Sequence, residues 1–567
     1  MLKDVKKEII KAIAVATKLP PHDISSLIET PKAPELGDFA FPCFKLATKL
    51  KKDPKIIASD IKSKLPKLKL IKKVEVVGPY LNFFIDMEVL ADNVLKEAIK
   101  LDYGFSKAKR GKVIVEFISP NTNKPLSLGH LRNAALGESI SRILEANGFK
   151  VIRACLYNDR GIHICKSMLA YQKWGSGKTP KSENVKGDHF VGDFYVLFNK
   201  KAGEDLKLND EAQEMLRKWE SGDRKTLELW SKLNQWVLDG FKETYKNFGI
   251  KFDKEYFESE HYKKAKDLIL QFYKKKFFKK DKEGNIIAEL GKFGLPDKVV
   301  LRADGTSVYI TQDIMLAKMK YDEFKPEISL YVVGDEQNLH FQQLFAILKL
   351  LNIKAGQYYH LSYGMVNLPS GKMKSREGTV VDADDLMQEL QNIVKIEIET
   401  RHNHEFTDKK MAELSRKISL AALKYYLLKF DPKTTMTFDP KQSIALEGDT
   451  GPYIQYALVR AKKILEKVKA KGKIKAKLLK LPEEIALIKH IAKFPLIVEK
   501  AGQSYQPHLI AIYARELADL FNTFYEKAPV MKANKELRNA RLYLVDAIRH
   551  TLQKALSLLG IEEVEVM

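Results

Sequence analysis

Val113-Ile-Val-Glu-Phe-Ile118 leads directly into Ser119-Pro-Asn-Thr-Asn-Lys-Pro-Leu-Ser-Leu-Gly-His130. The first part is an apolar run of the length expected for a buried parallel strand. Apolar residues then recur at helical spacing as far as Asn147-Gly148, which supplies a C-cap. Because Val151-Ile-Arg-Ala-Cys-Leu156 follows as a second strand-like run, this order predicts a βαβ unit. Parallel sheets of this kind bind ligands at the carboxyl ends of their strands.

The second half of the sheet is predicted much later in the chain. Ile328-Ser-Leu-Tyr-Val-Val333 has the composition of a strand, and the helix expected after it has an apolar face between Phe341 and Leu348. Residues of about 171–300 separate the two halves and have a mixed pattern, which predicts an insertion. We therefore expect one sheet domain over residues 106–411.

Two further modules are predicted beside this domain. Residues 1–105 combine an amphipathic opening with two strand-like stretches, Lys73–Val77 and Tyr80–Ile85, joined by the turn residues Gly78-Pro79. This combination predicts an α+β module. Residues 412–567 keep the helical period with no convincing strand, which predicts a helical bundle.

Composition narrows the class of protein. A chain of 567 residues suggests about three or four domains. Its formal net charge of +24 favours a polyanionic partner, nucleic acid before an anionic membrane, although a lysine-rich solvated surface is the alternative. No apolar run approaches the ~18 residues of a membrane helix, and the first residues lack a signal core. Cys43, Cys155 and Cys165 fit neither a disulfide framework nor a zinc site, so we expect a cytoplasmic protein without zinc.

Two loops contain the residue types of a nucleotide site. In the first, Gly129 allows close approach to the backbone, while Lys124 and His130 could stabilise charge on a phosphate near a helix N-terminus. A Gly-His pair alone would favour an incidental histidine in a Pro-containing loop. The second loop, Ser370-Gly-Lys-Met-Lys-Ser-Arg-Glu-Gly378, offers cations that could clamp a polyphosphate, but alone it would indicate a solvated loop.

Together these loops resemble the HIGH and KMSKS motifs of class I aminoacyl-tRNA synthetases. Further stretches, in the right order, are similar to those of arginyl-tRNA synthetases, and the resemblance covers essentially the whole chain. They are Glu35–Phe39, Gly78–Phe83, Asn158-Asp-Arg-Gly161, Lys186–Tyr195, Arg302–Asp313, Val333–Phe341, Gly451–Tyr456 and Leu520–Tyr525. The resemblance implies a reaction of ATP, L-arginine and tRNA(Arg) that gives arginyl-tRNA, AMP and diphosphate through an arginyl-adenylate.

The resemblance also implies the positions of the site residues. The catalytic set would be Lys124, Gly129, His130 and Lys372. ATP, arriving with Mg²⁺, would contact Ser127, Leu128, Gly129, His130, His340, Lys372, Met373, Lys374, Ser375 and Arg376. The arginine substrate would contact Glu116, Ser119, Asn121, Tyr309, Asp313 and Gln337. This second set is rich in acceptors, which a guanidinium group with five donors and no acceptor requires.

The implied fold is multidomain, with α/β and all-α parts. It comprises an N-terminal α+β module that contacts tRNA (1–105), a Rossmann-type parallel-sheet catalytic domain (106–411) and a helical anticodon-binding bundle (412–567). In the last of these, the types suited to contacts with splayed bases are Tyr453, Gln455, Tyr456 and Arg460, although the aromatic residues could equally be core. The resemblance further implies a monomer with no membrane partner.

Two residues depart from the motifs of the class. Ser127 stands where the first histidine of HIGH is usual, and Ser375 stands where the second lysine of KMSKS is usual. Lys124 is the substitute that the family resemblance implies for that lysine. Ser127 leaves open a non-catalytic tRNA-binding paralogue, and a class I synthetase for another amino acid is the other alternative.

Overall fold

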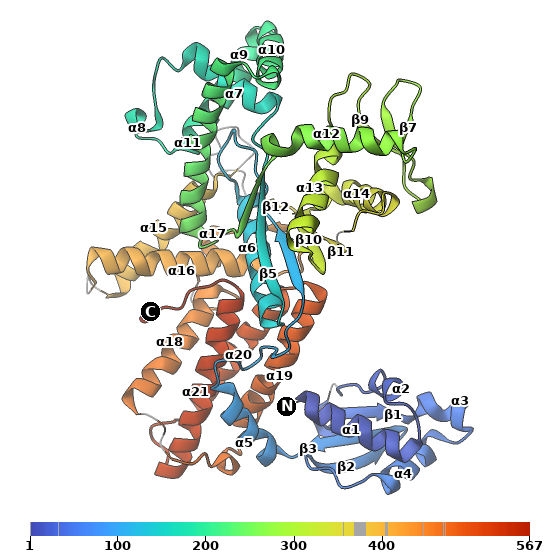
Figure 1. The fold of residues 1–567 in the computed structure, drawn as a ribbon. Coiled ribbons are helices and arrows are strands. Elements are labelled where there is room, and N and C mark those ends of the chain that lie inside the picture. Colours follow the sequence, from blue (N-terminus) through green and yellow to red (C-terminus); the bar gives the residue numbers. More distant parts are fainter. Residues whose placement is uncertain are drawn as a thin grey trace.

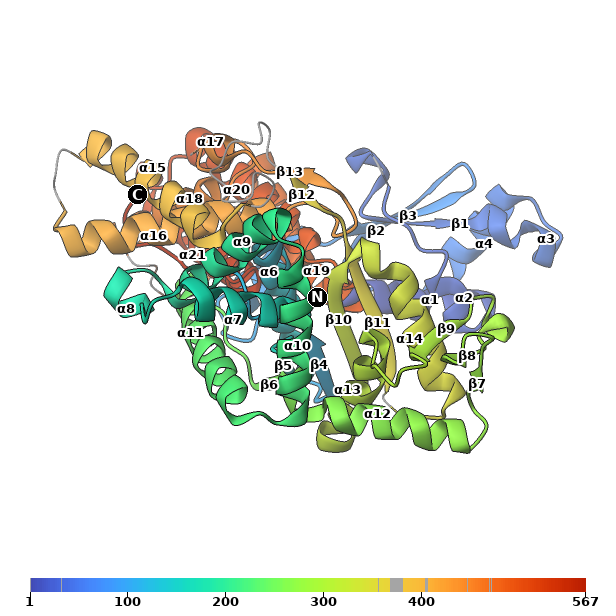
Figure 2. The ribbon, with the colours of Figure 1, turned by 90° about the horizontal axis from the view of Figure 1, so that it is seen from above.

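The structure, a computed structural model, describes residues 2–567 apart from residues 32, 355, 368–380, 403–405, 446, 469 and 471. It consists of an N-terminal α+β module, a central parallel sheet with helices and insertions, and a C-terminal group of long helices (Figure 1). Seen from above, the N-terminal module and the helices α15 (Ala383–His402) and α16 (Asp408–Leu428) lie on opposite sides of the molecule (Figure 2). The multidomain fold with α/β and all-α parts is therefore confirmed.

The N-terminal module is a three-stranded antiparallel sheet covered by short helices. Its strand order is β1-β3-β2, and the hairpin between β2 and β3 turns at Gly78, whose φ of 58° suits glycine. The elements are α1 (Leu2–Thr17), α2 (Pro21–Ser25), η1 (Pro34–Leu36), β1 (Phe39–Pro42), η2 (Cys43–Leu46), α3 (Ala47–Leu50), α4 (Pro54–Lys64), β2 (Ile71–Val77) and β3 (Tyr80–Ile85). Both strands that the sequence predicted in this module are present.

The next helix, α5 (Met87–Ala98), leaves this module and packs against the C-terminal helices α19 (Pro482–Ser504) and α21 (Lys535–Leu558). The Tyr103 hydroxyl donates to the backbone oxygen of Ile491 over 2.8 Å at the same junction. The segment between the module and the sheet is therefore held by the C-terminal helices.

The central sheet has five parallel strands in the order β11-β10-β4-β5-β6. The strands are β4 (Lys112–Glu116), β5 (Lys150–Tyr157), β6 (Lys254–Phe257), β10 (Ile328–Gly334) and β11 (Gln357–Tyr363). The connecting helices include α6 (Leu128–Ala146), α13 (Tyr309–Phe324) and α14 (Asn338–Leu350), with η4 (Asp335–Gln337) before the last. Strand order reverses between β4 and β10, so the carboxyl ends of these two strands form the switch point where α/β sheets bind ligands.

The stretch that the sequence predicted as one insertion is divided by β6. This four-residue strand is at the sheet edge and only one of its residues is buried, so it lacks the apolar run that indicates a central strand. Before it lie α7 (Ile162–Trp174), α8 (Pro180–Glu183), α9 (Gly187–Glu204), α10 (Lys207–Ser221) and α11 (Arg224–Phe248). After it lie α12 (Glu258–Lys274), β7 (Lys279–Lys280), β8 (Ile286–Ala288), η3 (Gly291–Phe293) and β9 (Lys298–Leu301).

The C-terminal part is built from long helices, as predicted. The long helices are α15, α16, α18 (Gly451–Lys467), α19, α20 (His508–Lys527) and α21, and the short elements α17 (Pro440–Ser443) and η5 (Ala476–Leu478) lie between them. The expectation of no strand after residue 412 is wrong in one detail, because β13 (Met436–Thr437) pairs in parallel with β12 (Val366–Asn367). A two-residue strand is too short to show a period. Among the residues that the structure describes, no helix is long and apolar enough to cross a bilayer.

Candidate functional site

The chain leaves β4 through an unusual backbone conformation. Ile118 and Ser119 both have positive φ values, 72° and 45°, which a β-branched residue such as isoleucine rarely adopts. The Ile118 amide donates to the side-chain oxygen of Asn133 over 2.6 Å. The side-chain nitrogen of Asn133 donates to Val332 O over 2.8 Å and to the Tyr363 hydroxyl over 3.0 Å. Asn133 therefore joins the carboxyl ends of β4, β10 and β11, and holds the strained turn at the switch point.

The helix α6 begins at Ser127, which is its N-cap. The Ser127 amide donates to Nδ1 of His130 over 3.0 Å, and the Ser127 hydroxyl lies 2.8 Å from the same atom. Burial, assisted by the nearby Lys124, lowers the pKa of His130 to about 4. His130 is thus neutral, and because Nδ1 accepts, its proton is at Nε2. Ser127 orients His130, which gives a serine at this position a defined structural role.

Beside His130, the backbone of Gly129 is exposed. A Cβ added at Gly129 would meet only the Ser127 hydroxyl, at 3.6 Å, and Lys124 is exposed on the loop before it. A ligand can therefore approach this helix N-terminus closely, beside a neutral donor and a cation.

The acidic residues predicted for arginine both lie near α13. Asp313 and Tyr309 are one turn apart on α13, and Asp313 Oδ2 lies 2.6 Å from His340 Nε2. Tyr309 is 72% exposed, so its ring is free to cover a ligand. Glu116 is buried and forms an ion pair with Lys320, whose ammonium group also lies 4.4 Å from the centre of the Tyr331 ring.

The remaining predicted arginine contacts occupy the rim. Gln337 is exposed at the end of η4, Asn121 is exposed and Ser119 is half-buried in the loop after β4. The structure therefore brings Ser119, Asn121, Ser127 and His130 onto one loop and Asp313 beside His340. The predicted loop residues Lys372, Met373, Lys374, Ser375 and Arg376 lie outside the described residues.

Two buried charges at this site were not predicted from the sequence. Arg132, on α6, donates to the backbone oxygens of Gly364, Met365, Pro432 and Thr434, and burial lowers its pKa to about 10. Lys320 is the second, because it carries the counter-charge of Glu116. Arg132 comes two residues after His130 in the sequence, but its partners are backbone groups that have no sequence pattern.

A groove of about 850 Å³ opens on the C-terminal helices. Its walls include Tyr456, Arg460, Lys463, Lys467, Tyr525 and Lys532. The Arg460 guanidinium is 4.7 Å from the ring centres of both Tyr456 and Tyr525, and it donates to the side-chain oxygen of Asn522 over 2.6 Å. Cations and aromatic faces together are suited to single-stranded nucleic acid. Tyr525 was not singled out from the sequence.

The other two residues predicted for RNA contact have internal partners. The Tyr453 hydroxyl donates to Asp519 over 2.8 Å and accepts from Asn522 over 2.9 Å. Gln455 is fully buried, and its amide donates to the backbone oxygen of Glu562 over 2.7 Å. Gln455 therefore holds the C-terminal segment inside the domain.

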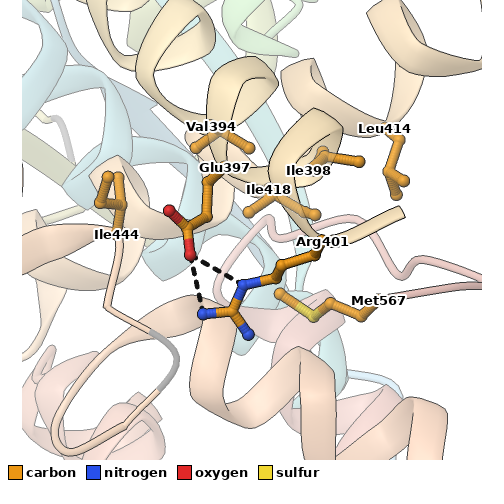
Figure 3. A pocket seen from close by; sticks show the side chains of 8 residues that line it. All are labelled: Val394, Glu397, Ile398, Arg401, Leu414, Ile418, Ile444 and Met567. Atoms are coloured by element: carbon orange, nitrogen blue, oxygen red, sulfur yellow. Dashed lines mark hydrogen bonds and ion pairs between the residues drawn. The ribbon is translucent and has the colours of Figure 1, made fainter. Parts of the chain in front are cut away.

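A second, small pocket of about 40 Å³ lies between α15, α16 and the chain end (Figure 3). Its walls are mainly aliphatic, and its two charged residues, Glu397 and Arg401, pair with each other. Met567 lines both this pocket and the larger groove. The small pocket lacks converging polar groups, so it is a packing gap beside the chain end.

Comparisons with known proteins assign all three parts. Residues 3–85 match the arginyl tRNA synthetase N terminal domain, residues 91–439 match the tRNA synthetases class I (R) catalytic domain, and residues 454–567 match the DALR anticodon binding domain. An arginine–tRNA ligase of Treponema denticola is 46% identical over 570 residues, which cover 97% of this chain and 96% of that protein. An arginine–tRNA ligase of Porphyromonas gingivalis is 43% identical over an alignment that covers 93% of this chain and 92% of that protein.

The fold leads to the same family. The structure of the Thermus thermophilus arginyl-tRNA synthetase superimposes with a TM-score of 0.84 at 28% identity, covering 99% of this chain and 100% of that one. On the family match over residues 91–439 and the two relatives that span nearly the whole sequence, the chain belongs to the arginyl-tRNA synthetase family.

Proposed function

We propose that this protein is an arginine–tRNA ligase, a class I aminoacyl-tRNA synthetase that forms L-arginyl-tRNA(Arg), AMP and diphosphate from ATP, L-arginine and tRNA(Arg). The observation that carries the proposal is the 2.6 Å contact between Asp313 Oδ2 and His340 Nε2. Asp313 belongs to the set expected around arginine and His340 to the set expected around ATP. Their contact supports two substrates bound side by side, as adenylyl transfer requires.

In the first step, the arginine carboxylate attacks the α-phosphorus of ATP, and diphosphate departs. We assign Asp313 and Glu116 to the acidic side of the arginine pocket, with Tyr309, Asn121, Ser119 and Gln337 as neutral partners. Asp313 is the more accessible acid, since its side chain is 24% exposed against 8% for Glu116. A guanidinium in such a pocket satisfies buried acceptors that most other amino acids would leave unpaired, which favours arginine.

At the phosphate side, the proton on His130 Nε2 and the ammonium group of Lys124 are placed to stabilise charge that develops on the α-phosphate and the departing diphosphate. Gly129 leaves room for the nucleotide, and Ser127 and Leu128 supply the helix N-terminus. Lys372 and Met373–Arg376 complete the proposed ATP contacts. Mg²⁺ enters with ATP as part of the substrate. Most of the acceleration comes from in-line positioning and charge stabilisation, with no protein nucleophile.

In the second step, a hydroxyl of the terminal ribose of tRNA attacks the adenylate. We assign residues 1–105 and 412–567 to tRNA contact and residues 106–411 to catalysis. Tyr456, Arg460 and Tyr525 are the proposed anticodon contacts. Tyr453 supports Arg460 through Asn522, which binds both side chains. We further propose that the enzyme acts as a monomer in the cytoplasm, where its three substrates are present.

The test is arginine-dependent exchange of diphosphate into ATP, with and without a tRNA(Arg) transcript, against lysine and citrulline controls. We expect exchange with arginine alone among the three amino acids, and only when tRNA is added. Citrulline has the shape of arginine without its charge, so its exclusion checks the acidic pocket. Absence of exchange from folded protein that still binds tRNA would overturn the proposal and favour a non-catalytic paralogue.

A further inference from the structure

The segment Lys186-Gly-Asp-His-Phe-Val-Gly-Asp-Phe-Tyr195 begins at the N-cap of the insertion helix α9, and the proposed reaction gives it no role. Three residues follow one another here at intervals of three: Lys186 at the N-cap, and His189 and Gly192 in the first two turns of α9. All three contact segments that hold the nucleotide loop.

The first two residues bind the segment that begins α15. Lys186 Nζ lies 2.6 Å from Asp384 Oδ2, and His189 Nε2 lies 3.2 Å from Asp382 Oδ2 and 3.4 Å from Asp384 Oδ2. Burial lowers the pKa of His189, but hydrogen bonds and charge from Asp382 and Asp384 outweigh it and raise the pKa to about 10, so His189 is a cation at neutral pH.

This cluster is an ion-pair network. The group Asp188, His189 and Asp384 has the composition of a metal site. However, the Lys186 ammonium group already lies 3.2 Å from Asp188 Oδ2 and 2.6 Å from Asp384 Oδ2. It also donates to Thr244 Oγ1 over 2.5 Å. Lys186 thus supplies the positive charge that a metal ion would bring.

From Asp382 the contacts continue directly to the nucleotide loop. Residues 381–383 run antiparallel to residues 126–128, with a bridge between Ser127 and Asp382. The Leu128 amide donates to Val381 O over 2.9 Å, and the Ala383 amide donates to Leu126 O over 3.0 Å. Since Ser127 orients His130, a shift of residues 381–383 would move the imidazole.

The third residue touches the same loop from α9 itself. A Cβ added at Gly192 would lie 2.8 Å from Pro125 Cδ and 3.4 Å from Lys124 Cα. Gly192 therefore lets the helix approach the loop closely at the base of Lys124. The other side of α9 lies close to α11. Gly240 of α11 faces Asp188 of α9, and Gly187 of α9 faces the backbone of Trp236 of α11. Helix α9 is thus packed between α11 and the loop.

We propose that Lys186, His189 and Gly192 are positioning residues, through which insertion helix α9 fixes the loop Lys124–His130 in the geometry that ATP binding and arginine activation need. The proposal rests on the proposed function, because it takes this loop as part of the ATP site. It gives these three residues a role through the loop that they hold.

The sharpest test compares two glycines of one helix. Gly192→Ala inserts a methyl group against Pro125, whereas at Gly203 an added Cβ meets nothing within 4 Å. Both changes favour the helix, which offsets part of the cost of the close contact at Gly192, so we expect at most a small fall in unfolding temperature for G192A and none for G203A. We expect G192A to raise KM for ATP and to lower kcat of the exchange reaction. Together these changes should lower kcat/KM for ATP by about 10- to 100-fold, since a small misplacement of the loop costs this much. KM for arginine and the Kd for tRNA should stay within about twofold, and G203A should match the wild type.

The ion pairs are tested in the same assay. Lys186→Met and His189→Asn should reduce kcat/KM for ATP as G192A does, and K186R, which keeps the cation, should recover most of it. The control is Lys173→Met, which removes a 2.7 Å ion pair to Glu211 in the same insertion.

Calorimetric titration with a non-hydrolysable ATP analogue, on wild type and variants, gives a readout independent of turnover. Variants that bind the analogue and turn over like the wild type would overturn the inference. An equal loss in all kinetic parameters, together with a lower unfolding temperature, would also overturn the inference, since that pattern indicates a structural role alone. A wild-type protein that neither binds the analogue nor exchanges would instead overturn the proposed function.

Discussion

The guanidinium group of Arg132, at the start of α6, donates to the backbone oxygen of Thr434 over 2.8 Å, although the two residues are 302 positions apart in the sequence. The same group binds the backbone oxygens of Gly364, Met365 and Pro432. One buried side chain thus joins the start of α6, the segment after β11 and the turn before β13. This arrangement fixes the start of α6, and with it the loop that precedes the helix, against the segment between α16 and β13.

Replacing Arg132 with Met should therefore destabilise the protein strongly. The backbone oxygens of Pro432 and Met365 would keep amide donors from Gly364 and Met436, but those of Gly364 and Thr434 would lose theirs. Unsatisfied groups of this kind cost about 1–3 kcal/mol each, so we expect a loss of about 2 kcal/mol or more. Thermal unfolding followed by circular dichroism would show a lower midpoint. R132K should be intermediate, because an ammonium group cannot reach all four oxygens. Arg142→Met, a partly exposed arginine of the same helix, is the control, and an equal effect there would contradict the prediction.

Replacing Asp313 with Asn should weaken arginine binding selectively. The change removes a charge but keeps an oxygen that can accept from His340 Nε2, so the ATP side is retained. A hydrogen bond to a charged group contributes about 1.5–3 kcal/mol, which predicts a rise of about 10- to 150-fold in KM for arginine. KM for ATP should change by less than about threefold. Asp322→Asn, an exposed acid on the same helix, should leave both constants unchanged in the diphosphate exchange assay.

The sequence predicted those parts of the site that one continuous segment encodes. The order of strand, loop and helix around Ser119–His130 follows from local periodicity and helix-start signals, and the structure has these elements. The sequence could not identify Lys320 as the partner of Glu116, because ion pairs between distant segments depend on how the helices pack. Short edge elements such as β6 and β13 were missed for a related reason, since their residues are stabilised by neighbouring strands and not by a pattern of their own.

Protein stability should depend on His189 between neutral and alkaline pH. Its imidazole faces Asp188, Asp382, Asp384 and Lys186, and its pKa, about 10 in the fold, lies above the ordinary value of 6.5. Because the pKa is higher in the folded than in the unfolded protein, protonation of His189 stabilises the fold. This stabilisation is complete below pH 6.5 and is lost as pH rises towards 10. The wild type should thus lose stability relative to His189→Asn over this range, by at most about 1.4 kcal/mol per pH unit. Unfolding temperatures at a series of pH values measure the difference.

The control for that series is His22→Asn, which changes an exposed histidine of the N-terminal module. Its unfolding temperature should follow that of the wild type at every pH. If the difference between the wild type and H189N is constant from pH 6 to pH 10, His189 does not carry the charge assigned to it.

Removing either aromatic wall of the C-terminal groove should weaken tRNA binding without changing arginine activation chemistry. The ring centres of Tyr456 and Tyr525 each lie 4.7 Å from the Arg460 guanidinium. Stacking of a base on an aromatic ring contributes about 1–3 kcal/mol, so Y456A and Y525A should each raise the Kd for tRNA(Arg) by about 5- to 150-fold. Filter binding with a transcript measures this change. At saturating tRNA the exchange rate should return to the wild-type value, because the groove contacts neither ATP nor arginine.

Tyr543→Ala is the matched control, since Tyr543 is on the same domain but its hydroxyl donates to Gly472 O, away from the groove. A second binding measurement uses an isolated anticodon stem-loop RNA. If the groove binds the anticodon, the stem-loop should lose affinity for Y525A as the full tRNA does. A stem-loop that binds wild type and Y525A equally, while full tRNA binds Y525A less well, would place another part of the tRNA in the groove. That outcome would keep the groove as an RNA site but reject the anticodon as its occupant.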